Sequence, residues 1–243
     1  MGRNPALRGT TWQFPEMASS RQSGIPKDIR LAANLFKSSQ DKSVGRHIRH
    51  LRRAELPIDT VQLARFLVGQ VLVHDLPEGR ISGRIVETEA YVVGDASGHA
   101  FRGPTRRNRS LYLERGHAYV YFVYASSFML NVSSDLPGVG AGVLFRALEP
   151  LDGIALMERN RHITRLLDLV RGPGRLTAAM RIDKQYDGVD LCGHGPLWLG
   201  AAGQPAVSIG ESVRIGLTRE VNRLLRFYER GNPFVSGPKR LRL

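Results

Sequence analysis

The sequence predicts an α+β fold, with an antiparallel or mixed, curved sheet as its centre. Three observations point there: strand-like runs outnumber helical ones, the helical runs are short, and no strand–helix–strand alternation repeats. With 243 residues and 42% hydrophobic residues, the chain suits one domain, or one domain with a tail.

A short helix and a long hairpin are expected to open the domain. Asp59 or Thr60 can cap a helix that ends at Gly69. Its apolar positions are Val61, Leu63, Ala64 and Leu67. A strand over 71–73 and a longer one over 81–91 follow, joined by the turn signal Pro77-Glu78-Gly79.

The later elements alternate between strands, loops and two more helices. Residues 94–110 are predicted to form a loop rich in glycine and arginine. The other predicted elements are strands over 118–131 with a bend at 125–127, a strand over 143–148, helices over 152–161 and 175–180, and late strands over 207–209, 213–215 and 226–229.

Residues 1–56 are predicted to be a basic, flexible tail, and residues 57–243 the folded domain. The tail lacks a sustained hydrophobic period, and its basic run over 46–53 suits either a solvated linker or a short helix. Arg-rich, acid-poor beginnings also occur in organelle transit peptides, and Met17 could be the native start. The sequence leaves these alternatives open.

The net charge of +13 favours a polyanionic partner, chiefly nucleic acid or an anionic membrane. Residues 1–58 contain 11 Lys and Arg against 4 Asp and Glu, so about half of the excess lies in the first quarter of the chain. The single cysteine, Cys192, excludes an intramolecular disulfide and a Cys-rich zinc site. No apolar run approaches the roughly 18 residues of a membrane span.

The stretch from Ile85 to Tyr91 is the most informative part of the chain. In a regular strand, Glu87, Glu89 and Tyr91 share one face, and His99 follows eight residues later. A carboxylate beside aromatic walls suits a flat, electron-poor ring next to a water that needs a base. An amphipathic hairpin with solvated glutamates is the alternative.

The loop from Arg102 to Arg109 is a candidate for binding the DNA backbone. Four arginines and Asn108 could hold phosphates, whereas a solvated charged loop is the alternative. The arginines are Arg102, Arg106, Arg107 and Arg109. The histidines lack His-Glu-x-x-His spacing, and no zinc-deaminase, Walker or dinucleotide motif is present, so we expect no metal and no cofactor.

From about Thr60 to Ser236 the chain resembles the alkyladenine DNA glycosylases, also called 3-methyladenine or methylpurine DNA glycosylases. The strings that match are 63–72, 83–91, 119–124 with Asn131, 144–150, 172–176 and 226–234. The resemblance implies a single domain with a curved, mainly antiparallel sheet and short helices, like the C-terminal domain of formyltransferases. The chain departs from the family at Ala125-Ser126, at Thr105-Arg106-Arg107-Asn108, and in a short, less acidic loop between Tyr91 and His99.

The resemblance also implies a role for each matching residue. Glu89 would be the general base that activates a water, and Arg146 would place Glu89, the water and a phosphate. The base pocket would consist of Tyr91, His99, Tyr121 and Asn131, with Asn131 where a guanine amino group would clash. Tyr124 would be the wedge in the duplex. No lysine matches a nucleophile position, so no lyase step is implied.

The resulting expectation is a monofunctional DNA glycosylase that removes alkylated or deaminated purines and leaves an abasic site. It would act as a monomer on double-stranded DNA, inside the cell where DNA is accessible, with organelle targeting left open. A noncatalytic, basic DNA- or RNA-binding protein on the same fold is the alternative. A formyltransferase-like RNA-binding domain is a third reading, disfavoured because no catalytic domain precedes it.

Overall fold

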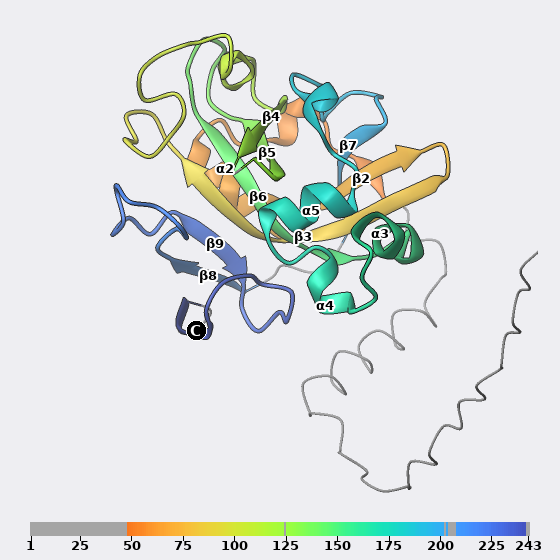
Figure 1. Cartoon of the computed structure of the whole chain (residues 1–243). Helices are drawn as coiled ribbons and strands as arrows, with labels where there is room; N and C mark the ends of the chain where they lie inside the picture. Colours follow the sequence, from red (N-terminus) through yellow and green to blue (C-terminus); the bar gives the residue numbers. More distant parts are fainter. Residues whose placement is uncertain (1–47, 124, 202, 204–207, 242–243) are drawn as a thin grey trace, which may run out of the picture. The chain divides into compact units, whose positions relative to one another are not determined.

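The computed structural model describes residues 48–123, 125–201, 203 and 208–241, all of which lie in one compact unit (Figure 1). In these residues nine strands form one open, antiparallel sheet, so the predicted α+β class is confirmed. The strands are β1 Arg49–His50, β2 Val71–Leu76, β3 Gly79–Tyr91, β4 Ala118–Val123, β5 Ser127–Ser133, β6 Gly142–Pro150, β7 Leu197–Ala201, β8 Ile209–Ser212 and β9 Arg226–Glu229.

β3 is the central strand, and it has different neighbours along its length. The sheet order is β1-β7-β2-β3-β6-β5-β4, while β9 pairs with both β3 and β8. The first half of β3, residues 79–84, pairs with β2, β6 pairs with β3 from Gly83 onward, and Glu87–Glu89 lies between β9 and β6. From Ile85 to Ala90 every side chain is buried on both faces. An ionised group in this stretch therefore needs a partner within the protein.

One row of paired residues crosses four strands of the sheet and collects polar side chains from three of them. Glu89 on β3 pairs with Leu144 on β6, and Leu144 pairs with Asn131 on β5. Asn131 in turn pairs with Tyr119 on β4. Residues paired across adjacent antiparallel strands are close neighbours, so this row brings residues from positions 89, 119 and 131 of the chain to one region.

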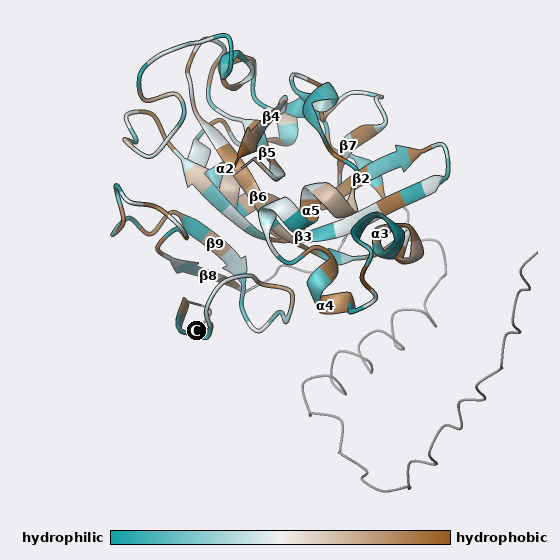
Figure 2. Ribbon diagram, in the orientation of Figure 1, coloured by the Kyte–Doolittle hydropathy of each residue, from teal (hydrophilic) through white to brown (hydrophobic). Residues whose placement is uncertain are grey.

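Short helices pack against this sheet. They are α2 Thr60–Leu67, α3 Ile154–Arg161, α4 Leu166–Leu169 and α5 Pro173–Ala179, and the 3₁₀ segments are Arg53–Glu55, Arg109–Tyr112, Lys184–Tyr186 and Lys239–Leu241. Asp59 caps α2 by accepting the N–H of Gln62 at 2.8 Å, as predicted. Figure 2 shows apolar residues on α5 and the central strands, and both apolar and hydrophilic residues on α3, which begins with Ile154-Ala155-Leu156-Met157. Within the described residues, every helix is too short or too polar to span a bilayer.

The prediction of a strand over Val213–Ile215 is wrong. β8 ends at Ser212, and the next three residues form an irregular loop. Their β-branched composition resembles a strand, but the N–H of Ile215 donates to the Glu89 carboxylate instead of to a neighbouring strand. Val207 lies outside the described residues.

Some elements differ from the expected boundaries or were not expected. β7 and α4 had not been predicted, and α3 begins after Gly153 because the Asp152 carboxylate accepts the hydroxyl of Ser82. Contacts with the domain also begin before Pro57. β1 pairs with β7, and Leu51 and Leu56 are buried in the core.

Candidate active site

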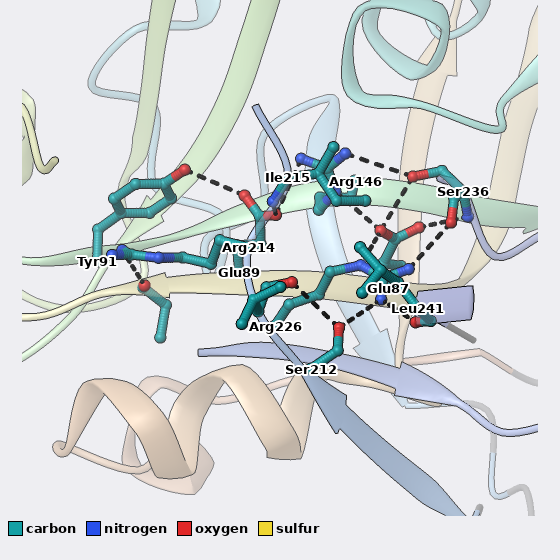
Figure 3. A network of polar contacts seen from close by, with 12 residues as sticks. Glu87, Glu89, Tyr91, Arg146, Ser212, Arg214, Ile215, Arg226, Ser236 and Leu241 are labelled. Atoms are coloured by element: carbon teal, nitrogen blue, oxygen red, sulfur yellow. Dashed lines mark hydrogen bonds and ion pairs between the residues drawn. The ribbon is translucent and has the colours of Figure 1, made fainter. Parts of the chain in front are cut away.

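Glu89 is a buried carboxylate with three polar neighbours, two of which donate hydrogen bonds while the third, Arg146, forms an ion pair with it. Its Oε1 accepts the N–H of Ile215 at 2.7 Å and lies 3.1 Å from Nη1 of Arg146. Its Oε2 accepts the phenol of Tyr91 at 3.0 Å. A carboxylate has about four acceptor positions, so one position remains for a further donor such as a water. Figure 3 shows Glu89 between Tyr91 and Arg146.

Glu87 lies two residues earlier on the same strand and binds two buried arginines. Its Oε1 accepts Nε of Arg146 at 2.8 Å and Nε of Arg226 at 2.7 Å. Ser236 donates its N–H to Oε2 at 2.6 Å and its hydroxyl to Oε1 at 2.9 Å. Two carboxylates and two guanidinium groups therefore balance their charges in the interior (Figure 3).

The pKa values of the two carboxylates shift in opposite directions. Burial raises the pKa of Glu89 above its ordinary value, and Arg146 and the Ile215 N–H only partly oppose this effect. Burial acts on Glu87 as well, but Arg146 and Arg226 outweigh it and hold the pKa of Glu87 below its ordinary value. Two carboxylates with pKa values pushed apart are a feature of acid–base sites, and Glu89 is the better proton acceptor of the two.

A cavity of about 180 Å³ lies beside this cluster. The residues predicted for a base pocket, Tyr91, His99, Tyr121 and Asn131, all line it. Its volume is below the roughly 300 Å³ of a small drug-binding pocket, so it suits one planar base. Tyr91 both lines this cavity and donates to Glu89, and so it connects the pocket to the carboxylate.

Tyr119 is a pocket residue that sequence reasoning missed. Its hydroxyl lies 2.8 Å from Nδ1 of His99, and its ring centroid lies 5.3 Å from that of Tyr121. Asn131 donates to the Tyr119 carbonyl at 3.3 Å. The signal was present, because Tyr119 has the same strand parity as Tyr121. Burial, followed by the charge of Arg107, lowers the pKa of His99, so its imidazole is neutral at neutral pH.

A buried ion pair supports Tyr91 from behind. Arg214 and Asp95 are almost fully buried and form two hydrogen bonds to each other. The guanidinium carbon of Arg214 lies 4.6 Å from the centroid of the Tyr91 ring. Arg214 also donates to the Ala90 carbonyl at 2.9 Å. No local pattern pointed to this support, because Arg214 lies more than 100 residues after Tyr91.

The four arginines of the loop between β3 and β4 are exposed. In the described part of the chain, no ion pair involves Arg102, Arg106, Arg107 or Arg109, and Arg107 lies over the ring of Tyr121 at 5.9 Å. Asn108 has a different role from the expected phosphate contact. It is buried, its oxygen accepts from Thr105 and its amide donates to the carbonyls of His99 and Gly103. Asn108 therefore holds the loop in shape.

Two further predictions concern the wedge and metal ions. Tyr124 lies outside the described residues, so its position in the site stays a prediction. Among the described residues, no three His, Cys, Asp or Glu side chains are grouped in a way that could hold a metal ion.

Comparison with known proteins agrees with the resemblance in the sequence. A family model described as methylpurine-DNA glycosylase matches residues 54–233. Three similar proteins carry the name "Putative 3-methyladenine DNA glycosylase". The protein of Mesorhizobium japonicum is 66% identical over 79% of this chain and 92% of its own length. Those of Paraburkholderia phytofirmans and Chlorobium phaeobacteroides are 54% and 42% identical, over 79% and 74% of this chain and 90% and 92% of their own lengths.

The family match includes the strands that hold Glu89 and Arg146, the lining of the cavity and the arginine loop. The matched residues make up well over half of the chain, and the chain covers about nine tenths of the length of the first two relatives. The chain therefore belongs to the methylpurine-DNA glycosylase family.

Proposed function

We propose that this protein is a monofunctional DNA glycosylase that excises alkylated or deaminated purines and leaves an abasic site. The observation that carries the proposal is the double role of Tyr91. It lines a cavity of a size that suits one base, and it donates a hydrogen bond to the buried carboxylate of Glu89. Because Tyr91 connects the cavity to Glu89, the proposal places the glycosidic bond of a base held there near this carboxylate. The relatives' names, which refer to 3-methyladenine, support the same reaction class.

In the proposed reaction Glu89 acts as the general base. A water bound at the free acceptor position of Glu89 gives its proton to the carboxylate while its oxygen attacks C1′ of the flipped nucleotide. The bond from C1′ to the purine nitrogen breaks, and its electron pair leaves with the base. The sugar passes through an oxocarbenium-like state, which the negative carboxylate stabilises. Arg146 holds the carboxylate in place at 3.1 Å.

The aromatic lining favours damaged purines over normal ones. Alkylation at a ring nitrogen makes a purine electron-poor or cationic, and stacking on tyrosine faces is stronger for such a ring. The neutral imidazole of His99 adds no positive charge that would repel a cationic base. Flipping costs a few kcal/mol and costs least for weakly paired damaged bases, which adds to the selectivity.

The charged surface supports binding of a DNA duplex by a single protomer. The exposed arginines of the 102–109 loop and the positive excess in the first 58 residues would contact phosphates. Tyr124, which follows β4 directly in the sequence, would fill the gap that the flipped base leaves in the duplex.

The test is an excision assay on duplex oligonucleotides that contain a single hypoxanthine or 7-methylguanine. Abasic sites are revealed by alkaline cleavage, and an undamaged duplex is the control. The proposal expects cleavage at the lesion only after alkali, because a monofunctional enzyme leaves the strand intact. Binding to both duplexes without any abasic product would instead identify a noncatalytic DNA-binding protein.

A further inference from the structure

We infer that Glu87 is a positioning residue of the excision reaction, which fixes Arg146 against Glu89 and makes the segment around Ser236 part of the catalytic apparatus. This inference rests on the proposed role of Glu89 as the base. It goes beyond that role because Glu87 touches neither the cavity nor the remaining acceptor position of Glu89.

The first argument is that Arg146 is held at two edges by two carboxylates. Its Nε binds Glu87 at 2.8 Å, and its Nη1 lies 3.1 Å from Glu89. A guanidinium is a rigid planar fork, so fixing one edge also fixes the direction of the other. Arg146 is also nearly buried, with 7% of the residue exposed, and solvent cannot replace either partner.

The second argument is that Glu87 is itself fixed far more firmly than a counterion requires. It accepts from Arg146, from Arg226 and twice from Ser236. Arg226 in turn donates to the hydroxyl of Ser212 and to the carbonyls of Ser236 and Leu241. The position of Arg146 is therefore connected, through one carboxylate, to β8, β9 and the segment that follows them (Figure 3).

The third argument concerns the charge that Glu89 experiences. The groups that face Glu89 are Glu87 and Tyr91 on β3, Arg146 on β6 and the N–H of Ile215, while Arg226 on β9 binds Glu87. Behind Tyr91 lies Arg214, paired with Asp95. The charge of Glu87 is one of the causes that raise the pKa of Glu89, after burial, and Arg146 opposes it. Glu87 therefore keeps Glu89 a stronger base.

The experiment measures single-turnover excision against pH for the full chain and for Glu87→Gln. The glutamine keeps the shape but removes the charge, so Arg146 is drawn toward its one remaining carboxylate. We expect excision to slow roughly 10- to 100-fold because the arginine is misplaced. We also expect the acidic limb of the pH profile to move to lower pH, because the charge of Glu87 that helps to raise the pKa of Glu89 is gone. Glu149→Gln is the matched control, since Glu149 binds Arg84 on the same two strands but away from Glu89.

A second variant separates positioning from charge compensation. Glu87→Gln leaves one buried arginine unbalanced and can unfold the protein, whereas Glu87→Gln/Arg226→Gln restores charge balance in the cluster. We expect the double variant to recover melting temperature but to excise at least tenfold more slowly than wild type, because a neutral glutamine at position 87 holds Nε of Arg146 less firmly than the carboxylate does. Ser236→Ala keeps every charge, and we expect it to slow excision a few-fold because it removes a hydrogen bond to Glu87.

Three results would overturn the inference. The first is a wild-type excision rate with an unmoved acidic limb in Glu87→Gln. The second is recovery of the excision rate together with stability in the double variant. The third applies if both glutamine variants fail to fold, and it is a wild-type excision rate in Ser236→Ala. Retained excision in Glu89→Gln would be a different result, because it would reject the proposed function itself.

Discussion

The backbone N–H of Ile215 donates a hydrogen bond to Oε1 of Glu89 at 2.7 Å, although 126 positions separate the two residues. The donor belongs to the main chain, so no side-chain replacement at position 215 except proline deletes it. The carboxylate therefore keeps its orientation only while the loop after β8 keeps its path. We make five predictions, which begin with the Glu89 carboxylate and end with the basic residues at the N-terminus.

Glu89→Gln is expected to abolish turnover while leaving binding to lesion DNA nearly unchanged. The amide keeps the size of the side chain but cannot take a proton from water, and general-base catalysis contributes roughly 10²–10⁴-fold. Single-turnover excision and binding by fluorescence anisotropy measure the two properties separately. A mutant rate within threefold of wild type would reject Glu89 as the base.

Excision by the wild-type protein is expected to fall as the pH drops through the raised pKa of Glu89. Below that pKa the carboxyl is protonated and accepts no proton, so the rate falls about tenfold for each further pH unit. Arg146→Met removes the main group that opposes burial, which raises the pKa of Glu89 further and moves the acidic limb to higher pH. An acidic limb that moves to lower pH in Arg146→Met would contradict this electrostatic account.

Gly237→Ala is expected to slow excision more than Gly231→Ala. Both glycines have positive φ angles, +79° and +75°, so alanine strains the backbone similarly at each. A methyl group at Gly237 would overlap Cδ1 of Ile215, whereas a methyl group at Gly231 meets no atom within 4 Å. Cδ1 is the end of the Ile215 side chain, so the excision rate tests whether this overlap also shifts the backbone N–H that binds Glu89. The comparison requires rates at equal folded fraction, and equal rates would show that the loop position is unimportant.

Asp95→Ala is expected to destabilise the fold by about 3–5 kcal/mol, because it leaves Arg214 buried without its partner. The melting temperature should fall by roughly 10 °C. Glu211→Ala is the control, since its pair with Arg65 is about 40% exposed on both sides and contributes less than about 1 kcal/mol. Thermal unfolding measures the melting temperatures of both variants. Similar decreases in melting temperature would mean that the buried pair stabilises the fold no more than the exposed pair does.

Deleting residues 1–47 is expected to leave the excision rate on saturating lesion DNA intact and to weaken binding to undamaged duplex. This cut removes 8 Lys and Arg and 3 Asp and Glu, but it keeps β1 and the buried Leu51. The affinity loss should shrink as salt increases, because phosphate contacts are screened. Titrations at two salt concentrations measure the effect, and a loss independent of salt would point to a contact of another kind.

The parts of the fold that were predictable from the sequence have a local pattern. The cap at Asp59, the hairpin around Pro77-Glu78-Gly79 and the strands bearing Glu89 and Arg146 depend on neighbours in the chain. The resemblance to a family supplied the pocket residues, and the structure brings those that it describes to one cavity.

The parts that were missed depend on contacts between distant segments. Arg226 and Ser236 bind Glu87 across 139 and 149 positions, and nothing near them in the chain indicates this partner. Val213–Ile215 resembled a strand because its composition is β-branched, but a buried carboxylate competes for the N–H of Ile215. Tertiary contacts of this kind override the local preference of a sequence for a strand.

The late position of Ile215, Arg226 and Ser236 has a consequence for protein synthesis. A nascent chain that has reached residue 211 already contains both carboxylates, Tyr91 and Arg146, but it lacks the donors of Ile215, Arg226 and Ser236. Chains grow from the N-terminus at about 5–20 residues per second, so the 126 positions between Glu89 and Ile215 take roughly 6–25 s to synthesise. A chain truncated after residue 211 lacks the donors of Ile215, Arg226 and Ser236, and we expect it to be inactive in the proposed excision reaction.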